Sequence, residues 1–265
     1  MCDLLWADNV SFRYSPDGPP VVDGVSVRIP SGGLVGILGP NGSGKTTLLR
    51  LLNGTRIATG GRVWLDDQSI GSLSRRAVAR RIAVVPQETE LAFEYRVLEI
   101  VLMGRHPHLG TFQVEGAADV AIAREALSAT GTLGLADRHF HTLSGGEKQR
   151  VIIASALAQG SAILLLDEPT ASLDLGYQLE ISSLLHRLNQ VRKVAMAIST
   201  HDLTLAAALC RDLVLLREGR VIAAGPTQAV LTPANIERLY DVEADVHVHA
   251  LTGRLAVVPL RRIPR

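Results

Sequence analysis

The chain contains 265 residues, and its 27 basic and 26 acidic residues leave a formal net charge of +1. A chain of this length can bury a proper hydrophobic core, whereas its balanced charge argues against a broad nucleic-acid-binding surface, so we expect no nucleic-acid partner. Two cysteines, Cys2 and Cys210, are too few for a disulfide framework or a zinc site, and no apolar run approaches the roughly 20 residues that span a membrane.

The first 30 residues alternate between polar and apolar side chains, which is typical of β-strands. One alternating run contains Val10, Phe12 and Tyr14, and a second runs from Val21 to Ile29. The turn-forming cluster Ser15–Pro20 separates them. This pattern predicts antiparallel β structure.

A glycine-rich motif follows the apolar run Leu34–Leu38. It reads Gly39-Pro40-Asn41-Gly42-Ser43-Gly44-Lys45-Thr46 and fits G-x-x-x-x-G-K-[ST], the pattern of a phosphate-binding loop. The run before it predicts a buried strand and the run from Thr47 to Leu52 predicts a helix, so the motif has the strand–loop–helix context that it requires. A plain glycine-rich turn is the alternative.

The chemistry of this loop follows from its glycines and its helix. The glycines would turn backbone N–H groups toward phosphate oxygens, and the positive end of the helix points at the same place. We therefore expect residues Gly39 to Thr47 to bind a nucleotide, with Lys45 at the terminal phosphates and Thr46 as a ligand of Mg²⁺. Tyr14 offers a flat face that would suit an adenine ring, although the pattern equally favours packing of Tyr14 in the sheet.

Between residues 60 and 160 the pattern changes from strands to helices. Ile82–Val85 predicts a buried strand that ends at Pro86-Gln87. Val97–Met103 and Ala117–Ala129 have helical spacing, and glycines break the segments around them. We interpret the segment from about residue 88 to residue 160 as a helical insertion into an α/β core.

The rest of the chain returns to alternating strands and helices. Ile163–Leu166 and Val194–Ile198 predict buried strands. Further along, the pattern predicts a hairpin around Glu218-Gly219, a helix that opens at Thr232-Pro233 and a second hairpin around Gly253.

The last hairpin contains His247 and His249. This H-x-H pair could bind a metal, but its alternation with Val246 and Val248 favours a solvent-facing strand.

Two carboxylates follow the buried strand Ile163–Leu166. The carboxyl end of a parallel strand faces the ligand site of such a sheet. Asp167 therefore suits Mg²⁺, and Glu168 could act as the general base that polarises an attacking water. A plain acidic pair at the surface is the alternative.

Ser144 and Glu147 form S-x-x-E, a capping box that predicts the start of a helix. Gly145 and Gly146 leave the first-turn N–H groups uncovered, which makes a second anion site. One nucleotide does not need two phosphate cradles in one subunit. A symmetric dimer would use both, because each capping loop could close over the nucleotide of the other subunit. An ordinary capped helix is the alternative.

The order of these motifs resembles the ATP-binding cassette ATPases over nearly the whole chain, from about Val10 to Ala224. The motifs are Gly39–Thr46, Gln87, Leu143–Glu147, Ile163–Glu168, Asp174 and His201. The resemblance implies an α/β fold with a P-loop NTPase core, in which helices flank a mixed, largely parallel sheet. It adds an N-terminal antiparallel β subdomain and the inserted helical subdomain. We accordingly divide the chain into an ATP-binding domain at 1–240 and a β-hairpin extension at 241–265.

The resemblance also implies a head-to-tail homodimer with ATP and Mg²⁺ at its interface, and it suggests a role for each residue. Tyr14 would stack on adenine, Gln87 would sense Mg²⁺ and the attacking water, and Glu168 would be the base. Ser144, Gly145 and Gly146 would contact the γ-phosphate held by the opposite subunit. Asp174 would lie in the loop that crosses between subunits. His201 would be the switch histidine, which contacts the γ-phosphate. Taken alone, a histidine such as His201 is more often structural.

The segment Phe93–His108 and the ending Leu213–Val246 are similar to the ATPases of importers for iron chelates, cobalamin and haem. This similarity implies uptake of a ferric siderophore, haem or cobalamin, driven by ATP hydrolysis. It implies two polytopic permease subunits, a periplasmic or surface solute-binding protein, and a peripheral position on the cytoplasmic side of the cell membrane. The alternative is a soluble, non-transport ATPase of the cofactor-assembly type.

We expect residues Glu88 to His108 to be the docking surface for the permease. The segment directly follows Gln87 and carries apolar side chains in a region that reads as a surface insertion, which suggests an interface. These side chains are Leu91, Phe93, Tyr95 and Leu98. The alternative is that they pack the helical insertion against the core.

Overall fold

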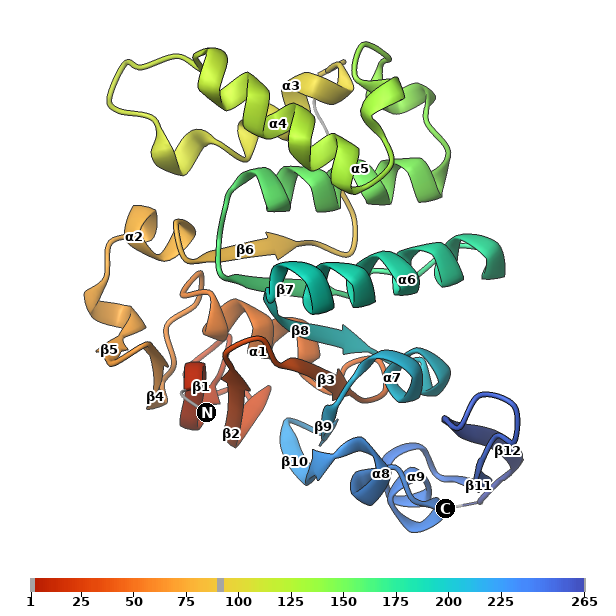
Figure 1. The fold of residues 1–265 in the computed structure, drawn as a ribbon. Helices are drawn as coiled ribbons and strands as arrows, with labels where there is room; N and C mark the ends of the chain where they lie inside the picture. Colours follow the sequence, from red (N-terminus) through yellow and green to blue (C-terminus); the bar gives the residue numbers. More distant parts are fainter. Residues whose placement is uncertain (1–2, 90–92, 265) are drawn as a thin grey trace.

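A computed structural model describes residues 3–89 and 93–264 of the protein (Figure 1). Within these residues the strands form three sheets. The first is antiparallel, in the order β2-β1-β4-β5, and comprises β1 (Asp3–Phe12), β2 (Val22–Pro30), β4 (Gly60–Leu65) and β5 (Gln68–Ser69).

The second sheet is the central one, with the order β10-β9-β3-β8-β7-β6. The five strands from β9 to β6 run parallel, and β10 pairs antiparallel at one edge. Its strands are β3 (Leu34–Leu38), β6 (Ile82–Val85), β7 (Ile163–Asp167), β8 (Ala195–Thr200), β9 (Asp212–Arg217) and β10 (Arg220–Pro226). The third sheet is the hairpin of β11 (Val242–Val248) and β12 (Leu255–Arg262).

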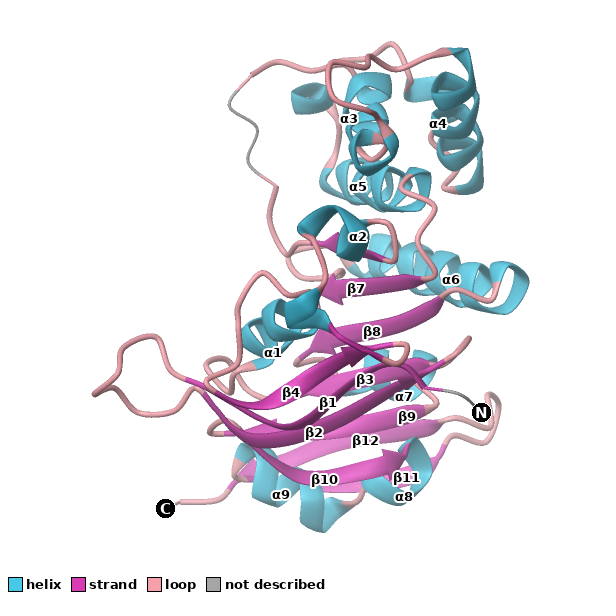
Figure 2. Cartoon of the chain, turned by 90° about the vertical axis from the view of Figure 1, so that its left-hand side faces the viewer, coloured by secondary structure: helices cyan, strands magenta, loops and turns pink. Residues whose placement is uncertain are grey.

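The helices surround the central sheet. Three of them form a separate layer beyond its β6 edge (Figures 1 and 2): α3 (Val97–Met103), α4 (Ala117–Ala129) and α5 (Gly145–Ala158). The others are α1 (Lys45–Leu52), α2 (Arg75–Ala79), α6 (Leu175–Arg192), α7 (Leu203–Leu209), α8 (Thr227–Val230) and α9 (Pro233–Tyr240).

Two hydrophobic cores lie on opposite faces of the central sheet, because successive side chains of a strand point to opposite faces. One set of alternate residues packs with α1 and the antiparallel sheet: Val35, Ile37, Ile163, Leu165, Ala195, Ala197, Val214 and Leu216. The other set packs with the helices of the opposite side: Leu34, Leu38, Leu164, Leu166, Met196, Ile198, Leu213 and Leu215. Burial on both faces explains why these strands read as continuous apolar runs.

The predicted fold class is confirmed: a largely parallel sheet with flanking helices, an antiparallel β sheet near the N-terminus and a helical layer. The hairpin near the C-terminus is also present, with His247 on β11 and half exposed. His249 lies beyond the end of β11, so the prediction that both histidines belong to a strand is correct only for His247.

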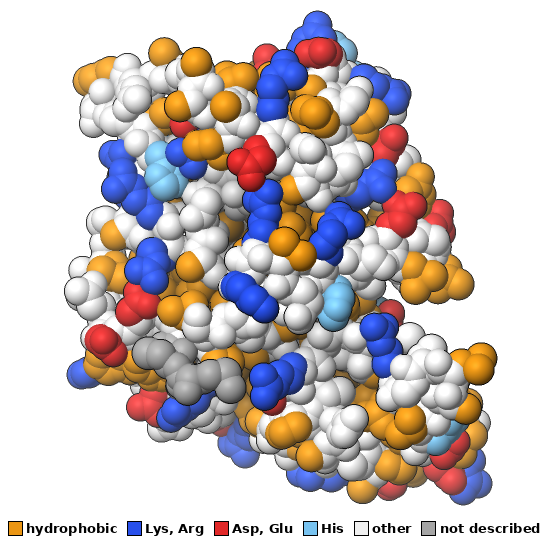
Figure 3. Space-filling view, in the orientation of Figure 1, with side chains coloured by type: hydrophobic (Ala, Val, Ile, Leu, Met, Phe, Trp, Pro, Cys, Tyr) orange, Lys and Arg blue, Asp and Glu red, His pale blue; other side chains and the backbone are white. Residues whose placement is uncertain are grey.

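Among residues 3–89 and 93–264, no helix combines the length and the apolar character needed to cross a membrane. On the face seen in Figure 3, basic side chains are interspersed with acidic and apolar ones.

The topology gathers the candidate residues at one edge of the central sheet. Strands β3, β8, β7 and β6 are consecutive neighbours and run parallel, so their carboxyl ends lie side by side. The segments that leave these ends begin at Gly39, His201, Glu168 and Pro86. Ligands of open α/β sheets bind outside the carboxyl ends of the strands.

Candidate functional site

A hollow of about 660 Å³ opens at these carboxyl ends. Nine of the predicted site residues line it: Asn41, Gly42, Gly44, Lys45, Thr46, Thr47, Gln87, Glu168 and His201. They come from segments that are far apart in the sequence and that meet only through the order of the parallel strands. The hollow is large enough for a small-molecule ligand.

The glycine loop has the backbone that phosphate binding requires. Gly44 caps the N-terminus of α1 with a φ of 102°. A Cβ on Gly44 would lie 2.5 Å from the carbonyl oxygen of Val21, so no larger residue fits there. Ser43 is 2% exposed, and its Oγ atom has no hydrogen-bond partner within the described chain. A buried hydroxyl without a partner is costly, and a phosphate oxygen would satisfy it.

The Glu168 carboxylate contacts two other predicted residues. Its Oε1 atom lies 3.2 Å from Nζ of Lys45, and its Oε2 atom lies 3.0 Å from Nδ1 of His201. Lys45 also donates to the backbone carbonyls of Gly39 at 2.9 Å and Pro40 at 3.1 Å. The three ionisable side chains therefore form one connected group in the lining of the hollow.

Asp167 and Glu168 have different surroundings although they are adjacent. Asp167 ends β7, is 7% exposed and accepts a hydrogen bond from the Ser199 hydroxyl of the neighbouring strand. Glu168 has a φ of 46°, a left-handed conformation that is uncommon for a residue with a side chain. Such strain persists where the surroundings fix it and is concentrated at functional sites. Here it directs Glu168 into the hollow, while Asp167 stays in the sheet edge.

Gln87 and Tyr14 lie at the surface. Gln87 follows β6 and is exposed at the rim of the hollow. Tyr14 lies beyond the end of β1 and is 55% exposed, so the interpretation that it packs within the sheet is wrong. Its hydroxyl is 3.1 Å from Oγ1 of Thr47, and its ring packs edge-on against Phe12. The Arg56 guanidinium lies over the ring, 5.7 Å from its centroid, and the partly exposed ring lies beside α1.

The predicted capping box is confirmed at the N-terminus of α5. The backbone N–H of Ser144 donates to Oε2 of Glu147 at 2.8 Å, and the backbone N–H of Glu147 donates to Oγ of Ser144 at 3.3 Å. The first of these bonds is the main reason that the pKa of Glu147 lies below its ordinary value. Ser144, Gly145 and Gly146 are not among the residues that line the hollow.

Asp174 caps helix α6, and its Oδ1 atom accepts from the backbone N–H of Tyr177 at 3.0 Å. Like the residues at the start of α5, Asp174 does not line the hollow. The prediction that it lies in a segment that crosses between subunits concerns a second copy of the chain and stays a prediction.

Sequence reasoning missed two tyrosines. Tyr177 covers the start of α5, where a Cβ on Gly146 would lie 2.1 Å from the Tyr177 ring. Tyr240 of α9 donates from its hydroxyl to the backbone carbonyl of His201 at 3.1 Å. Burial, and then the charges of Asp202 and Glu168, raise the pKa of Tyr240 far above its ordinary value, so this hydroxyl keeps its proton. No local pattern marks either tyrosine, because each acts on a distant segment.

Other residues of the hollow were also missed. They follow β7, lie at or just beyond the end of β8, or belong to α6, and they supply hydroxyl, amide and carboxylate groups: Thr170, Ser172, Gln178, Thr200 and Asp202. Thr200 and Asp202 flank His201 in the sequence, and this adjacency could have identified both as residues of the site.

The sequence model of a family described as ABC transporter matches residues 22–171. The cobalamin import ATP-binding protein BtuD of Halobacterium salinarum is 43% identical over 92% of this chain, which spans 61% of that relative's length. The ferric enterobactin transport ATP-binding protein FepC of Escherichia coli is 39% identical over 91% of this chain and 89% of its own length. The hemin import ATP-binding protein HmuV of Bordetella pertussis is 40% identical over 91% of this chain and 94% of its own.

A solved structure has the same architecture. It is described as an inward-facing conformation of a metal-chelate type ABC transporter. The match has a TM-score of 0.86, 31% sequence identity and 98% coverage of both chains.

Proposed function

The chain belongs to the ABC transporter family of ATPases, and we propose that it is the ATP-hydrolysing subunit of an importer for an iron chelate, haem or cobalamin. One observation carries the importer assignment. Three relatives that are 39–43% identical over at least 91% of this chain are import or transport ATP-binding proteins for these solutes. The choice among ferric siderophore, haem and cobalamin is left to experiment.

ATP would bind with its phosphates in the loop from Gly39 to Thr47. The orphaned Ser43 hydroxyl and the glycine backbone suit phosphate oxygens, and Lys45 supplies the charge. The exposed ring of Tyr14 would stack on adenine. Thr46, Asp167 and Gln87 carry the oxygen atoms that Mg²⁺ prefers, and Mg²⁺ would neutralise charge on the phosphates.

Hydrolysis needs a base, and we propose Glu168 for that role. A water molecule would attack the γ-phosphorus while the bond to the bridging oxygen of ADP breaks, and Glu168 would accept the proton of that water. His201, whose Nδ1 atom lies 3.0 Å from the Glu168 carboxylate, would orient this side chain and contact the γ-phosphate.

We propose that the active site is composite and forms in a head-to-tail homodimer. The turn from Ser144 to Gly146 offers N–H groups at a helix start but does not line the hollow of its own chain. A second copy would bring its turn, with Asp174, onto the γ-phosphate. Closing over ATP would then join two subunits and provide the force for transport.

The partners of this dimer would be two polytopic permease subunits, with a periplasmic or surface solute-binding protein beyond them. The ATPase would sit peripherally on the cytoplasmic side of the cell membrane. The second candidate is a soluble ATPase of the cofactor-assembly type, which the cassette architecture alone permits. The import and transport functions of the three relatives favour the importer.

Uptake in a deletion strain tests the proposal. Radiolabelled ferric siderophore, haem and cobalamin are supplied separately, and the strain is complemented with the wild-type chain or with Glu168→Gln. We expect uptake of one solute to return with the wild type and to remain absent with Glu168→Gln. Unchanged uptake of all three solutes in the deletion strain, with an active ATPase in vitro, would favour the second candidate.

A further inference from the structure

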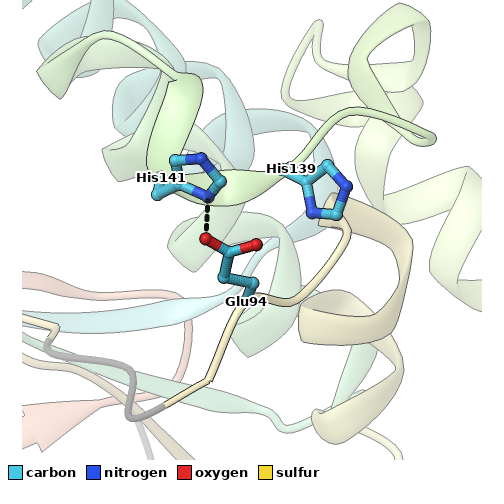
Figure 4. A group of neighbouring side chains, drawn as sticks. All are labelled: Glu94, His139 and His141. Atoms are coloured by element: carbon cyan, nitrogen blue, oxygen red, sulfur yellow. Dashed lines mark ion pairs between the residues drawn. The ribbon is translucent and has the colours of Figure 1, made fainter.

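Two histidines and a glutamate meet outside the nucleotide hollow. Glu94 lies between β6 and α3, whereas His139 and His141 lie between α4 and α5. One ligand atom from each residue lies within 4.8 Å of the others. Figure 4 shows the Glu94 carboxylate between the two imidazole rings. From this cluster we propose that Glu94, His139 and His141 bind a divalent transition-metal ion of the Zn²⁺ class.

The backbone holds the two segments together without the help of a metal. Arg96 and His139 form an antiparallel β-bridge. The N–H of Val97 donates to the carbonyl of Arg138 at 2.9 Å, and the N–H of Phe140 donates to the carbonyl of Tyr95 at 3.0 Å. Backbone pairing therefore brings together the two segments that carry the three side chains.

Both imidazoles lie near Glu94 although the segment is not a strand: His139 caps the 3-10 helix Phe140–Thr142, and His141 lies within it. Phe140, between the histidines, is 6% exposed and packs into the hydrophobic core. The rings of His139 and His141 lie on either side of the Glu94 carboxylate. Two imidazole nitrogens and one carboxylate oxygen are a donor set that binds Zn²⁺ with one position left for water.

The distances suit closure around an ion. Tetrahedral Zn²⁺ with bonds of about 2.0–2.1 Å brings its ligand atoms to about 3.3 Å from one another. Nδ1 of His141 and Oε1 of Glu94 are 4.0 Å apart, and these side chains are 56% and 76% exposed, so they are free to approach. Small side-chain rotations would complete the coordination.

An ion pair alone accounts poorly for the cluster. A separation of 4.0 Å is too long for a hydrogen bond, and an ion pair this exposed contributes little to stability. It also leaves out His139, whose Nδ1 atom is buried and has no hydrogen-bond partner among the described residues. A buried nitrogen without a partner is costly, and coordination to a metal would remove that cost.

One neighbouring charge opposes the binding of a cation. Lys148 lines the same surface hollow of about 280 Å³ as Glu94 and His141. Its ammonium group lies 5.8 Å from the centroid of the Phe140 ring. We expect Lys148→Met to tighten metal binding, because that substitution removes a positive charge and keeps the length of the side chain.

The proposed metal site lies between two parts of the proposed ATPase site, so its effect on the ATPase rests on the proposed function. Glu94 is seven residues after Gln87, and His141 is three residues before Ser144. A bound ion would therefore tie the segment that leaves the nucleotide site to the turn that we expect to close over the other subunit's nucleotide. Metal binding would reinforce the backbone pairing that already joins these two segments.

Titration of the tag-free, metal-stripped chain tests the site in the absence of nucleotide. Co²⁺ serves as a spectroscopic probe, because tetrahedral Co²⁺ has intense visible absorption, and Zn²⁺ is then added in competition. We expect one Co²⁺ per chain, displaced by Zn²⁺. His139→Ala, His141→Ala and Glu94→Gln should each weaken binding by at least about tenfold.

The second H-x-H pair supplies a matched control. The double variant His247→Ala and His249→Ala should bind Co²⁺ like the wild type, whereas equal weakening by this double variant would overturn the proposal. Absence of stoichiometric binding by the wild type, or unchanged affinity in His141→Ala, would overturn it too. Because His141 is exposed, its loss should leave the fold intact, and retained binding of a fluorescent ATP analogue would verify this. A chain that binds metal but hydrolyses no ATP would contradict the proposed function and leave the metal site standing.

Discussion

The Nζ atom of Lys45 lies 3.2 Å from Oε1 of Glu168, so the cation of the phosphate loop and the carboxylate that follows β7 form a buried ion pair. The two side chains are 5% and 10% exposed. Removing one partner of such a pair leaves the other charge buried without compensation. The pair thus links the residue that would hold the phosphates to the residue that would activate water.

We predict that substituting Lys45 impairs ATP binding, whereas substituting Glu168 impairs ATP hydrolysis. Lys45→Ala removes the charge that would meet the β- and γ-phosphates, so ATP affinity should fall. Glu168→Gln keeps the shape but removes the base, so ATP should bind while turnover falls by a factor of roughly 10² to 10⁴. Equilibrium binding of a fluorescent ATP analogue and steady-state phosphate release measure the two effects. Near-normal turnover in Glu168→Gln would remove Glu168 from the role of base.

Tyr240 gives a second prediction, because its hydroxyl holds the carbonyl of His201 at 3.1 Å. Tyr240→Phe removes this one hydrogen bond, worth about 0.5–1.5 kcal/mol, and keeps the ring. If the bond positions His201 for hydrolysis, kcat should fall by up to about tenfold while KM for ATP stays unchanged. Tyr95→Phe, which removes a hydroxyl outside the hollow, is the matched control. A rise in KM with an unaltered kcat would contradict the positioning role.

The local parts of this site could be predicted from the sequence. The phosphate loop and the capping box of Ser144 and Glu147 are short patterns whose geometry depends on neighbouring residues only. The position of Glu168 followed from one further rule, that the carboxyl end of a parallel strand faces the ligand site, whereas His201 was assigned a role only through the resemblance to the cassette ATPases.

The remaining contacts depend on how distant segments pack, which no local pattern encodes. Tyr240 reaches His201 only because α9 is anchored to the central sheet, where Arg217 of β9 pairs with Asp241 at 2.8 Å. The cluster of Glu94, His139 and His141 joins two loops of the helical layer through backbone pairing. The pair His247 and His249 could be identified from the sequence because it lies in an alternating pattern typical of a strand. The pair His139 and His141 lies outside any strand, so no such pattern marks it.

The composite site gives a third prediction. Ser144→Arg would place a bulky cation at the dimer interface, so hydrolysis should be abolished while nucleotide still binds to Lys45. Mixing this variant with Lys45→Ala should restore ATP-dependent dimer formation. In the mixed dimer, one site combines the intact Lys45 of the first subunit with the intact Ser144 of the second.

Size-exclusion chromatography with ATP measures this complementation. Ser128→Arg, the same substitution at an exposed position of α4, is the control and should leave hydrolysis unchanged. If each nucleotide were enclosed within a single subunit, the mixed dimer would contain no intact site. The absence of dimers in the mixture would therefore count against a composite site.

The last prediction concerns the segment that we expect to dock on the permease. Its apolar residues divide into two groups: Tyr95 and Leu98 are partly buried and pack against the core, as the alternative proposed, whereas Phe93 is 72% exposed. Leu91 falls outside the described residues. The Phe93 ring contacts Tyr95 edge-on, with 6.2 Å between the ring centroids. Tyr95 packs against the hydrophobic core and thereby supports the exposed Phe93 ring. Phe93 is therefore the residue that we expect to contact the membrane partner.

Crosslinking in membranes tests this contact. Phe93→Cys is placed in a background without Cys2 and Cys210, and it is probed against single cysteines in the cytoplasmic loops of the permease. Burial raises the pKa of the Cys210 thiol to about 12, so little reactive thiolate forms. Cys210 should therefore react little even where it is retained. We expect crosslinks whose yield changes when ATP is added, because closure of the dimer would move the segment that follows Gln87. Leu251→Cys, at a side chain that is 92% exposed in the β11–β12 turn, controls for nonspecific reactivity. Equal crosslinking at both positions, or none at Phe93 alongside normal uptake, would mean that the permease docks elsewhere.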